Sequence, residues 1–248
     1  MTKLFISFII SFSAGLSTLL GILPIFIGNK YHNKVIAFSL AFSSGVMIAI
    51  SLFSLIPESI NYMADEISFP IIILFLIFFL LGIGISFLID TGVAFKVKNH
   101  NLYRVGIISI IALIIHNIPE GITSFLTTSS NLKLGIALSI GIALHNIPEG
   151  IAIAVPIYYS THSRFRAFLY TFIAGFSELL GAILAYCFFL KFINSFFLAM
   201  ILAITAGIMI HVSLGELLPN SIKYNNDELV FIGLIMGISI MIISIIVL

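Results

Sequence analysis

Eight apolar runs, each long enough to cross a lipid bilayer, constrain the fold of this chain more than any other feature of its sequence. A membrane-spanning helix needs about 20 apolar residues. Runs of that kind cover residues 4–27, 35–56, 69–90, 105–127, 134–159, 167–190, 197–222 and 229–248. Only 8% of the residues are charged, against about 25% in a soluble domain, so the chain cannot enclose these runs in a charged surface. We therefore predict an all-α integral membrane protein with eight transmembrane helices.

The basic residues between these runs predict the orientation of the chain. Cytoplasmic segments of membrane proteins collect Lys and Arg. One set of connections holds Lys30, Lys34, Lys96, Lys98, Arg104, Arg164, Arg166 and Lys223, and the other side holds Lys3, Lys133 and Lys191. We predict a multi-pass protein of the cytoplasmic membrane, with the first set inside and both termini outside. The net charge of +1 gives no argument for nucleic-acid binding.

Two stretches of the first half of the chain resemble two stretches of the second half. AGLSTLLG at 14–21 matches AGFSELLG at 174–181, and GVMIAISLFSLIP at 45–57 matches GIMIHVSLGELLP at 207–219. The paired spans run in opposite directions across the membrane, and inverted repeats of this kind are typical of transporters. We predict one transmembrane transporter domain, 1–248, with a 3+2+3 plan: a three-helix repeat at 1–90, a central metal-binding helix pair at 105–159 and a second repeat at 167–248.

The hexapeptide HNIPEG occurs twice, at 116–121 and at 145–150, and lies within an apolar span each time. Because each residue of an α-helix turns by about 100°, the glutamate projects between the histidine and the asparagine of its own motif. Two such faces opposed to each other form a cage. Its side chains are His116, Asn117, Glu120, His145, Asn146 and Glu149. Pro119 and Pro148 are expected to kink the helices and to free one backbone carbonyl each.

A cage of this composition suits first-row divalent cations. Imidazole with carboxylate favours Zn²⁺, with Fe²⁺, Mn²⁺, Co²⁺ and Cd²⁺ as competitors. An acidic side chain at the centre of a bilayer costs about 2.5–3.5 kcal/mol on an insertion scale, and a bound cation offsets that cost. The alternative interpretation is that these side chains only join helices through hydrogen bonds. That interpretation fits one isolated residue better than two identical hexapeptides.

Three further ionisable residues distinguish the second repeat from the first. Glu178 lies where the first repeat has a threonine, and it is a candidate for direct contact with the metal. Glu216 and His211 lie on different faces of the seventh span, where the first repeat has serine and alanine. Both are candidates for the transport pathway.

Three other residues are given structural roles by the sequence. Glu58 follows the second apolar run and is expected to be a solvated charge in an outer loop. Asp90, at the end of the third run, is expected to cap a helix. Cys187, the single cysteine, is expected to pack as a small hydrophobic side chain.

These features together resemble the ZIP family (Zrt-/Irt-like proteins), and in particular its short bacterial zinc-uptake members. The resemblance covers the whole chain, and the HNxPEG pattern on spans four and five is its most specific part. Ser54 departs from the acid that some bacterial relatives carry on the second span. The resemblance implies uptake of Zn²⁺ or another divalent ion into the cytoplasm by alternating access. The family is often dimeric, which implies a homodimer here, and no prosthetic group is expected.

The resemblance also implies a two-metal transport site, carried over by motif position. The primary site corresponds to His116, Glu120, His145 and Glu149. The secondary site corresponds to Asn117, Asn146 and Glu178, with the two motif glutamates bridging the metals.

An intramembrane zinc-dependent hydrolase is the alternative function. An HxxxE pair on each of two helices could hold a catalytic zinc with an open coordination position. The chain has no HExxH motif and supplies no further base or oxyanion donor beyond the ligands. Because the inverted repeats also favour transport, we expect a transporter rather than an enzyme.

Overall fold

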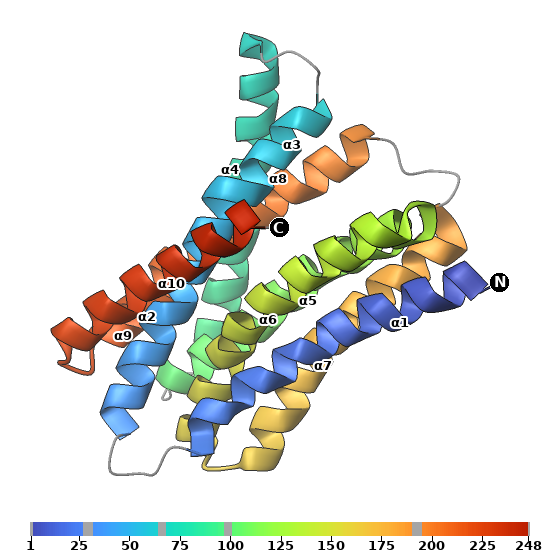
Figure 1. Cartoon of the computed structure of the whole chain (residues 1–248). Coiled ribbons are helices and arrows are strands. Elements are labelled where there is room, and N and C mark those ends of the chain that lie inside the picture. Colours follow the sequence, from blue (N-terminus) through green and yellow to red (C-terminus); the bar gives the residue numbers. More distant parts are fainter. Residues whose placement is uncertain (1, 27–31, 64–67, 97–100, 190–194, 248) are drawn as a thin grey trace.

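The computed structural model describes residues 2–26, 32–63, 68–96, 101–189 and 195–247, and every regular element in these residues is a helix (Figure 1). In chain order the elements are α1 (Thr2–Leu16), η1 (Ser17–Phe26), α2 (His32–Ile50), η3 (Ser51–Leu55), α3 (Ile56–Met63), α4 (Phe69–Lys96), α5 (Asn101–Ser130), α6 (Leu132–Thr161), α7 (Arg164–Leu184), η4 (Ala185–Phe189), α8 (Ser195–His211), η5 (Val212–Leu217), α9 (Leu218–Ile222) and α10 (Asp227–Val247). They join into eight helical spans long and apolar enough to cross a membrane. This confirms the predicted all-α membrane class.

The predicted and observed spans differ most at the end of the second span. The apolar run ends at residue 56, whereas the helix continues through α3 to Met63. The π-helical turn η3 widens the helix directly before Pro57, which has no N–H to donate to the preceding turn. Glu58 therefore lies on a helix, and its predicted position in a loop is wrong.

The helices form two groups, which are distinguishable in Figure 1. The site bundle consists of α1 with η1, α5, α6 and α7. The flanking bundle consists of α2, α4, α8 and α10 with the short elements that continue α2 and α8. In the site bundle α5 packs along α7 and α6, and α6 packs along η1, whereas in the flanking bundle α2 packs along α10 and α4 along α8. The most extensive contact between the bundles is that of α2 with α6.

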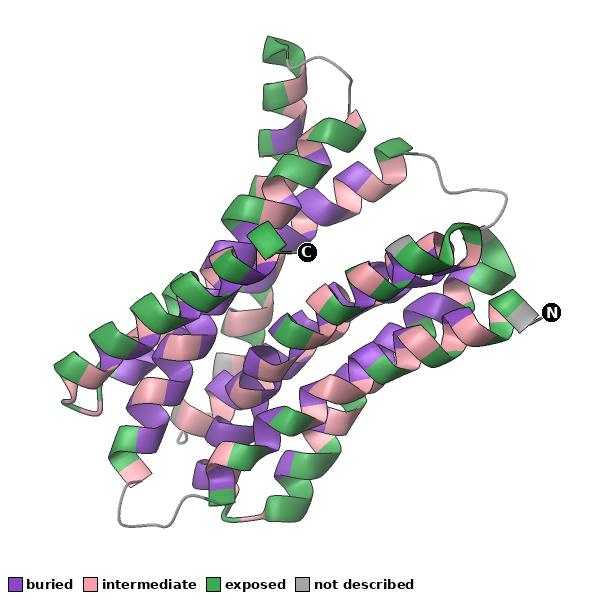
Figure 2. Ribbon diagram, viewed as in Figure 1, coloured by how far each residue is buried: buried purple, intermediate pink, exposed green. Residues whose placement is uncertain are grey.

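Apolar side chains cover the outside of both bundles, as expected for helices whose solvent is lipid. Figure 2 shows buried residues concentrated on the inward faces of the helices and exposed residues on the outward faces. On α4, for example, Leu80 and Leu88 are 61% and 69% exposed. Cys187 is also exposed, on η4. Its predicted role as a packed core residue is wrong, because an apolar run does not reveal which face of the helix meets the lipid.

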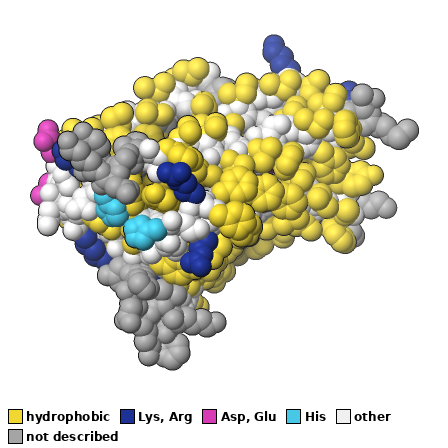
Figure 3. All heavy atoms as spheres, turned by 90° about the horizontal axis from the view of Figure 1, so that it is seen from below, with side chains coloured by type: hydrophobic (Ala, Val, Ile, Leu, Met, Phe, Trp, Pro, Cys, Tyr) yellow, Lys and Arg dark blue, Asp and Glu magenta, His cyan; other side chains and the backbone are white. Residues whose placement is uncertain are grey.

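Basic side chains gather at one end of the molecule. Lys34, Arg104 and Arg164 lie within the first turns of α2, α5 and α7, and Lys223 lies between α9 and α10. Figure 3 shows several Lys, Arg and His side chains on the face seen from below. Lys30, Lys98 and Lys191, which also entered the orientation prediction, lie outside the described residues.

Glycines bring the backbones of the site bundle into direct contact. A Cβ atom on Gly121 of α5 would overlap the carbonyl oxygen of Glu178 on α7. A Cβ atom on Gly150 of α6 would overlap the carbonyl oxygen of Thr18 on η1. Gly121 and Gly150 end the two hexapeptides, and Thr18 and Glu178 are matched positions of the two similar octapeptides. Thus α5 packs on α7 through the same sequence positions by which α6 packs on η1.

The flanking bundle contains a second pair of matching contacts. A Cβ atom on Gly45 of α2 would overlap the carbonyl oxygen of Leu234 on α10, and one on Gly207 of α8 would overlap that of Phe79 on α4. Gly45 and Gly207 are matched positions of the two similar thirteen-residue stretches. The similar sequences therefore make similar helix contacts in both bundles.

Candidate metal centre

Both HNIPEG motifs lie within long helices that remain α-helical through their prolines. Pro119 lies inside α5 and Pro148 inside α6. Hydroxyl groups supply donors to carbonyl oxygens near the second motif: Ser43 donates to the carbonyl oxygen of Pro148 at 2.6 Å, and Ser17 donates to that of Ala143 at 2.9 Å. Hydroxyl groups of neighbouring helices thus supply donors to two backbone carbonyls of this segment, as suits a membrane interior.

The two asparagines are anchored in the same way on two neighbouring helices, α7 and α1. Asn117 donates its amide N–H to the carbonyl oxygen of Ala174 on α7 at 2.9 Å. Asn146 donates to the carbonyl oxygen of Ala14 on α1 at 3.0 Å. Both asparagines are fully buried. Because each nitrogen is held by a backbone carbonyl, each amide oxygen is left free to bind something else.

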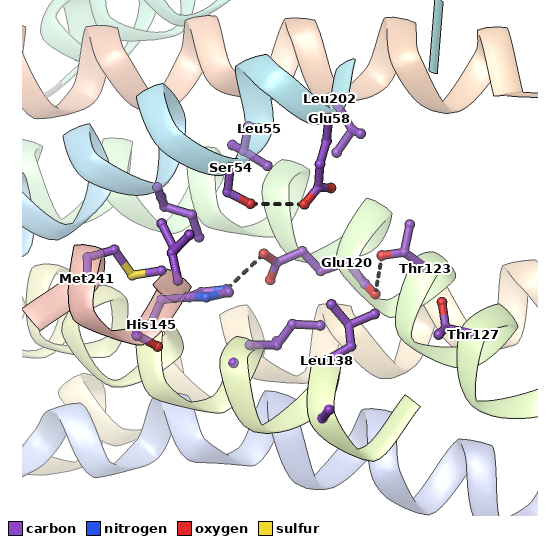
Figure 4. Close-up of a pocket in the computed structure, with 16 residues that line it drawn as sticks. Ser54, Leu55, Glu58, Glu120, Thr123, Thr127, Leu138, His145, Leu202 and Met241 are labelled. Carbon is purple, nitrogen blue, oxygen red and sulfur yellow. Dashed lines mark hydrogen bonds and ion pairs between the residues drawn. The ribbon is translucent and has the colours of Figure 1, made fainter. Parts of the chain in front are cut away.

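The histidines and glutamates of the two motifs converge on one point between α5 and α6. Glu120 Oε1 lies 3.0 Å from His116 Nε2 and 2.8 Å from His145 Nε2. Glu149 Oε1 lies 3.2 Å from His116 Nε2, and the two imidazole rings are 6.2 Å apart between centroids. Figure 4 shows the side chains of Glu120 and His145 pointing toward each other across the cavity. The sequence motifs therefore meet in space, as the prediction of opposed faces required.

Glu178 extends this cluster on the side of the asparagines. It is fully buried on α7, and its Oε2 accepts a hydrogen bond from Asn146 at 2.9 Å. Contacts thus link His116, Glu120, His145 and Glu149 into one group and join Asn146 to Glu178. Asn117, which follows His116 in the chain, contacts Ala174.

Six of the eight side-chain amide and carboxylate oxygens of this cluster lack hydrogen-bond donors. In the described part of the chain, the buried amide and carboxylate oxygens without a partner are those of Asn117 and Asn146 and one or both of the carboxylate oxygens of Glu120, Glu149 and Glu178. Buried polar atoms in native proteins nearly always have partners. A group of unpartnered acceptors at one place is therefore the signature of a site for cations.

The separations within the cluster fit a small divalent ion. Ligand atoms at about 2.0–2.2 Å from a tetrahedral Zn²⁺ lie about 3.3 Å from one another, close to the 2.8–3.2 Å between the imidazole nitrogens and the carboxylate oxygens here. One ligand atom each of His116, His145 and Glu149 lie within 4.8 Å of one another. Small adjustments of the side chains are enough to enclose an ion.

A cavity of about 450 Å³ leads to this cluster from one end of the molecule. Glu120 and His145 form its deep part, while Ser54 and Glu58 lie on the opposite wall (Figure 4). Ser54 Oγ donates a hydrogen bond to Glu58 Oε1 at 3.1 Å. Glu58 is thus a carboxylate of the cavity wall, one helical turn beyond the position where the sequence shows a serine in place of an acid.

His211 and Glu216, the two predicted pathway residues, make no contact with the cluster among the described residues, and they contact different partners. His211 Nδ1 is 2.9 Å from Ser86 Oγ of α4, and its ring packs edge-on against Phe87. Glu216 Oε1 accepts a hydrogen bond from Arg104 of α5 at 3.2 Å, and Arg104 also pairs with Asp90. Asp90 is therefore an ion-pair partner and not merely a cap.

Sequence comparisons agree with the composition of the site. The sequence model of a family described as ZIP zinc transporter matches residues 95–245, which include both motifs and Glu178. Three relatives, each named zinc transporter ZupT, come from Chlorobium limicola, Clostridium perfringens and Chlorobium luteolum. They are 37%, 35% and 39% identical to this chain over 100%, 98% and 95% of its length and over 100%, 96% and 95% of their own.

Proposed function

We infer the function from the premise that this chain belongs to the ZIP zinc transporter family, a membership shown by the family match and by the full-length relatives. The chain is accordingly a multi-pass protein of the cell membrane that transports divalent metal ions. The family consists of transporters, so the alternative of an intramembrane hydrolase is not favoured. We propose that its substrate is Zn²⁺, as the names of its relatives indicate for those proteins. The homodimer implied by the resemblance stays a prediction.

The proposed site holds two metal ions side by side. His116, His145, Glu120 and Glu149 surround the first ion, and their atoms already lie at nearly the required separations. Asn117, Asn146 and Glu178 supply unpartnered oxygens for the second, with Glu120 and Glu149 between the two. Glu120, Glu149 and Glu178 are buried carboxylates that pair with no Lys or Arg among the described residues, and they support this proposal, since a buried charge requires a partner. This oxygen-rich buried cage is the observation that carries the proposed function.

Transport is proposed to occur by alternating access in which the site bundle slides against the flanking bundle, each bundle taking helices from both of the proposed inverted repeats. The matching glycine contacts and the matching asparagine anchors support the repeat. In each pair of contacts, the residues that make one contact correspond in sequence to the residues that make the other. The cavity reaches the site from the end that holds Glu58, opposite the basic end. With the basic end in the cytoplasm, this geometry represents a state open to the outside.

Zn²⁺ influx into proteoliposomes loaded with a zinc-sensitive dye tests this proposal. We expect influx through the native chain and none above background through the Glu120→Ala/Glu149→Ala variant or into empty vesicles. Folded, correctly inserted native protein that moves neither Zn²⁺ nor Fe²⁺, Mn²⁺ or Cd²⁺ would contradict it, and the hydrolase alternative would then have to be tested.

Acid is expected to slow uptake. Imidazole binds metal in its neutral form, carboxylate in its ionised form, and histidine ordinarily titrates near pH 6.5. Protons therefore compete with the metal, and influx at subsaturating Zn²⁺ is expected to be several-fold slower at about pH 5.5 than at about pH 7. Initial rates in the same proteoliposomes measure this effect, with an ionophore-mediated flux as the control for the dye. A flat pH profile would show that binding to the cage does not limit transport.

Glu58 is expected to raise the local concentration of cations at the cavity mouth. Replacing it with glutamine removes one negative charge from the wall and keeps the side-chain volume, so the half-saturating Zn²⁺ concentration should rise by a few-fold with little change in the maximal rate. The difference should shrink at high ionic strength, because salt screens exposed charges. Glu228→Gln, an exposed acid at the start of α10, serves as the matched control. If the two variants have the same half-saturating Zn²⁺ concentration, Glu58 does not contribute to the transport pathway.

A further inference from the structure

Arg104 lies at the end of α5 opposite the cavity. It precedes His116 by twelve residues, which corresponds to about 18 Å along an α-helix. Its guanidinium donates through Nε to Asp90 Oδ1 at 3.0 Å and through Nη2 to both Asp90 Oδ1 and Glu216 Oε1. One side chain thus joins three helical elements at the end of the molecule opposite the cavity that leads to the site.

These ion pairs connect the two bundles. Arg104 belongs to α5 of the site bundle, whereas Asp90 and Glu216 belong to α4 and η5 of the flanking bundle. In the described part of the chain, the other side-chain ion pairs all lie among His116, Glu120, His145 and Glu149, inside the site bundle. The charged contacts that hold one bundle to the other are therefore concentrated at Arg104.

The partners of Arg104 are themselves held in place. Asn220 donates to the backbone carbonyl of Glu216 at 2.7 Å, and Lys223 donates to Asn220 Oδ1 at 2.9 Å. The side chains of Arg104, Asp90 and Glu216 are 28%, 15% and 7% exposed, so solvent screens these pairs less than pairs on an open surface. The guanidinium offers several donors in a fixed plane, which allows it to serve two carboxylates at once.

We propose that Arg104 is the residue that keeps the cytoplasmic end closed while the cavity is open on the other side. This inference deepens the proposed function, since it rests on alternating access by movement of the site bundle against the flanking bundle. Such a movement must separate Arg104 from Asp90 and Glu216. The ion pairs therefore favour the state open toward Glu58, and their loss shifts the population toward the opposite state.

Accessibility of a single thiol in the cavity tests this role without requiring transport. Cys187 is replaced by serine, and Thr127, which lines the cavity on α5, is replaced by cysteine. The full chain is placed in lipid nanodiscs, where both faces are open to solution, and a charged maleimide reports how long the cavity stays open. We expect the thiol to react about threefold more slowly, or slower still, when Arg104→Gln is added, because the cavity is then closed for more of the time. Arg104→Lys should lie between the two.

Arg166→Gln is the matched control, since Arg166 is an exposed basic residue at the same end that forms no ion pair with the residues of the flanking bundle that the structure describes. An unchanged rate in a folded Arg104→Gln protein, or an equal decrease with Arg166→Gln, would overturn the assignment. The charge exchange Arg104→Asp/Asp90→Arg is expected to restore the labelling rate at least in part, and this keeps the test valid if Arg104→Gln is unstable.

A protein that transports zinc but shows no change in labelling refutes the role of Arg104 alone. A labelling change without any metal influx refutes the proposed function alone.

Discussion

Zinc influx through the Glu149→Gln variant is expected to fall to the level of empty vesicles. Glutamine has nearly the same volume as glutamate, so the change removes charge and leaves the packing of α6 intact. Both carboxylate oxygens of Glu149 are buried without a hydrogen-bond partner, and one of them lies 3.2 Å from His116 Nε2. Loss of a residue that only supports a metal ligand already costs about 10–100-fold in affinity, and loss of Glu149, the ligand proposed to bridge the metals, should cost at least as much.

The control for this experiment is Glu228→Gln, which removes an exposed carboxylate from α10 and should leave influx unchanged. Equal amounts of reconstituted protein and equal elution profiles in detergent show that both variants are folded. Zinc binding measured by calorimetry on the purified variants separates a loss of binding from a block of movement. Native-like influx through Glu149→Gln would reduce the second HNIPEG motif to a structural element.

Gly121→Ala is expected to destabilise the protein strongly although it adds one methyl group. The new Cβ would overlap the backbone carbonyl of Glu178, so α5 and α7 must move apart. Overpacking of a closely packed site costs about 1–3 kcal/mol, and here the displaced backbone also carries a residue of the cage. We therefore expect a lower thermal midpoint together with a loss of most zinc influx.

Gly84→Ala provides the control, because Gly84 lies in another membrane-spanning helix, α4, and a Cβ there meets no atom within 4 Å. Thermal unfolding in detergent, followed by the fraction of monodisperse protein after heating, compares the two variants. If Gly121→Ala is as stable as Gly84→Ala, the close approach of α5 and α7 is not needed for the fold.

The convergence of the two motifs could be predicted because it depends on local geometry and on repetition. The helical rotation places Glu120 beside His116 within one motif, and an identical motif on the next span supplies the opposite face. Glu178 could be found because an ionisable residue replaces a threonine in an otherwise matching octapeptide. The resemblance of HNxPEG to a known family points to the same residues, and the match at 95–245 agrees with it.

Other features depend on information that apolar runs do not contain. Glu58 was placed in a loop because counting apolar residues ignores an amphipathic continuation of the helix into α3. The ion pairs of Arg104 depend on where two long side chains meet a third helix, although the signal was available: Asp90 and Arg104 flank the same short connection with opposite charges. The exposure of Cys187 depends on which face of α7 and η4 is left uncovered by the other helices.

The glycine contacts in the site bundle also determine how the cage can adapt to ions of different radius. Where two backbones are in direct contact, no side chain lies between the helices that could change its rotamer. Therefore α5 cannot move closer to α7, nor α6 closer to η1. The frame around the ion is therefore stiff, and adjustment falls to rotation of the glutamate and histidine side chains. In the proposed site, we expect these side chains to extend inward around a small ion such as Zn²⁺ and to draw back around a larger one such as Cd²⁺. A rigid frame with adjustable ligands discriminates strongly by charge and only weakly by size.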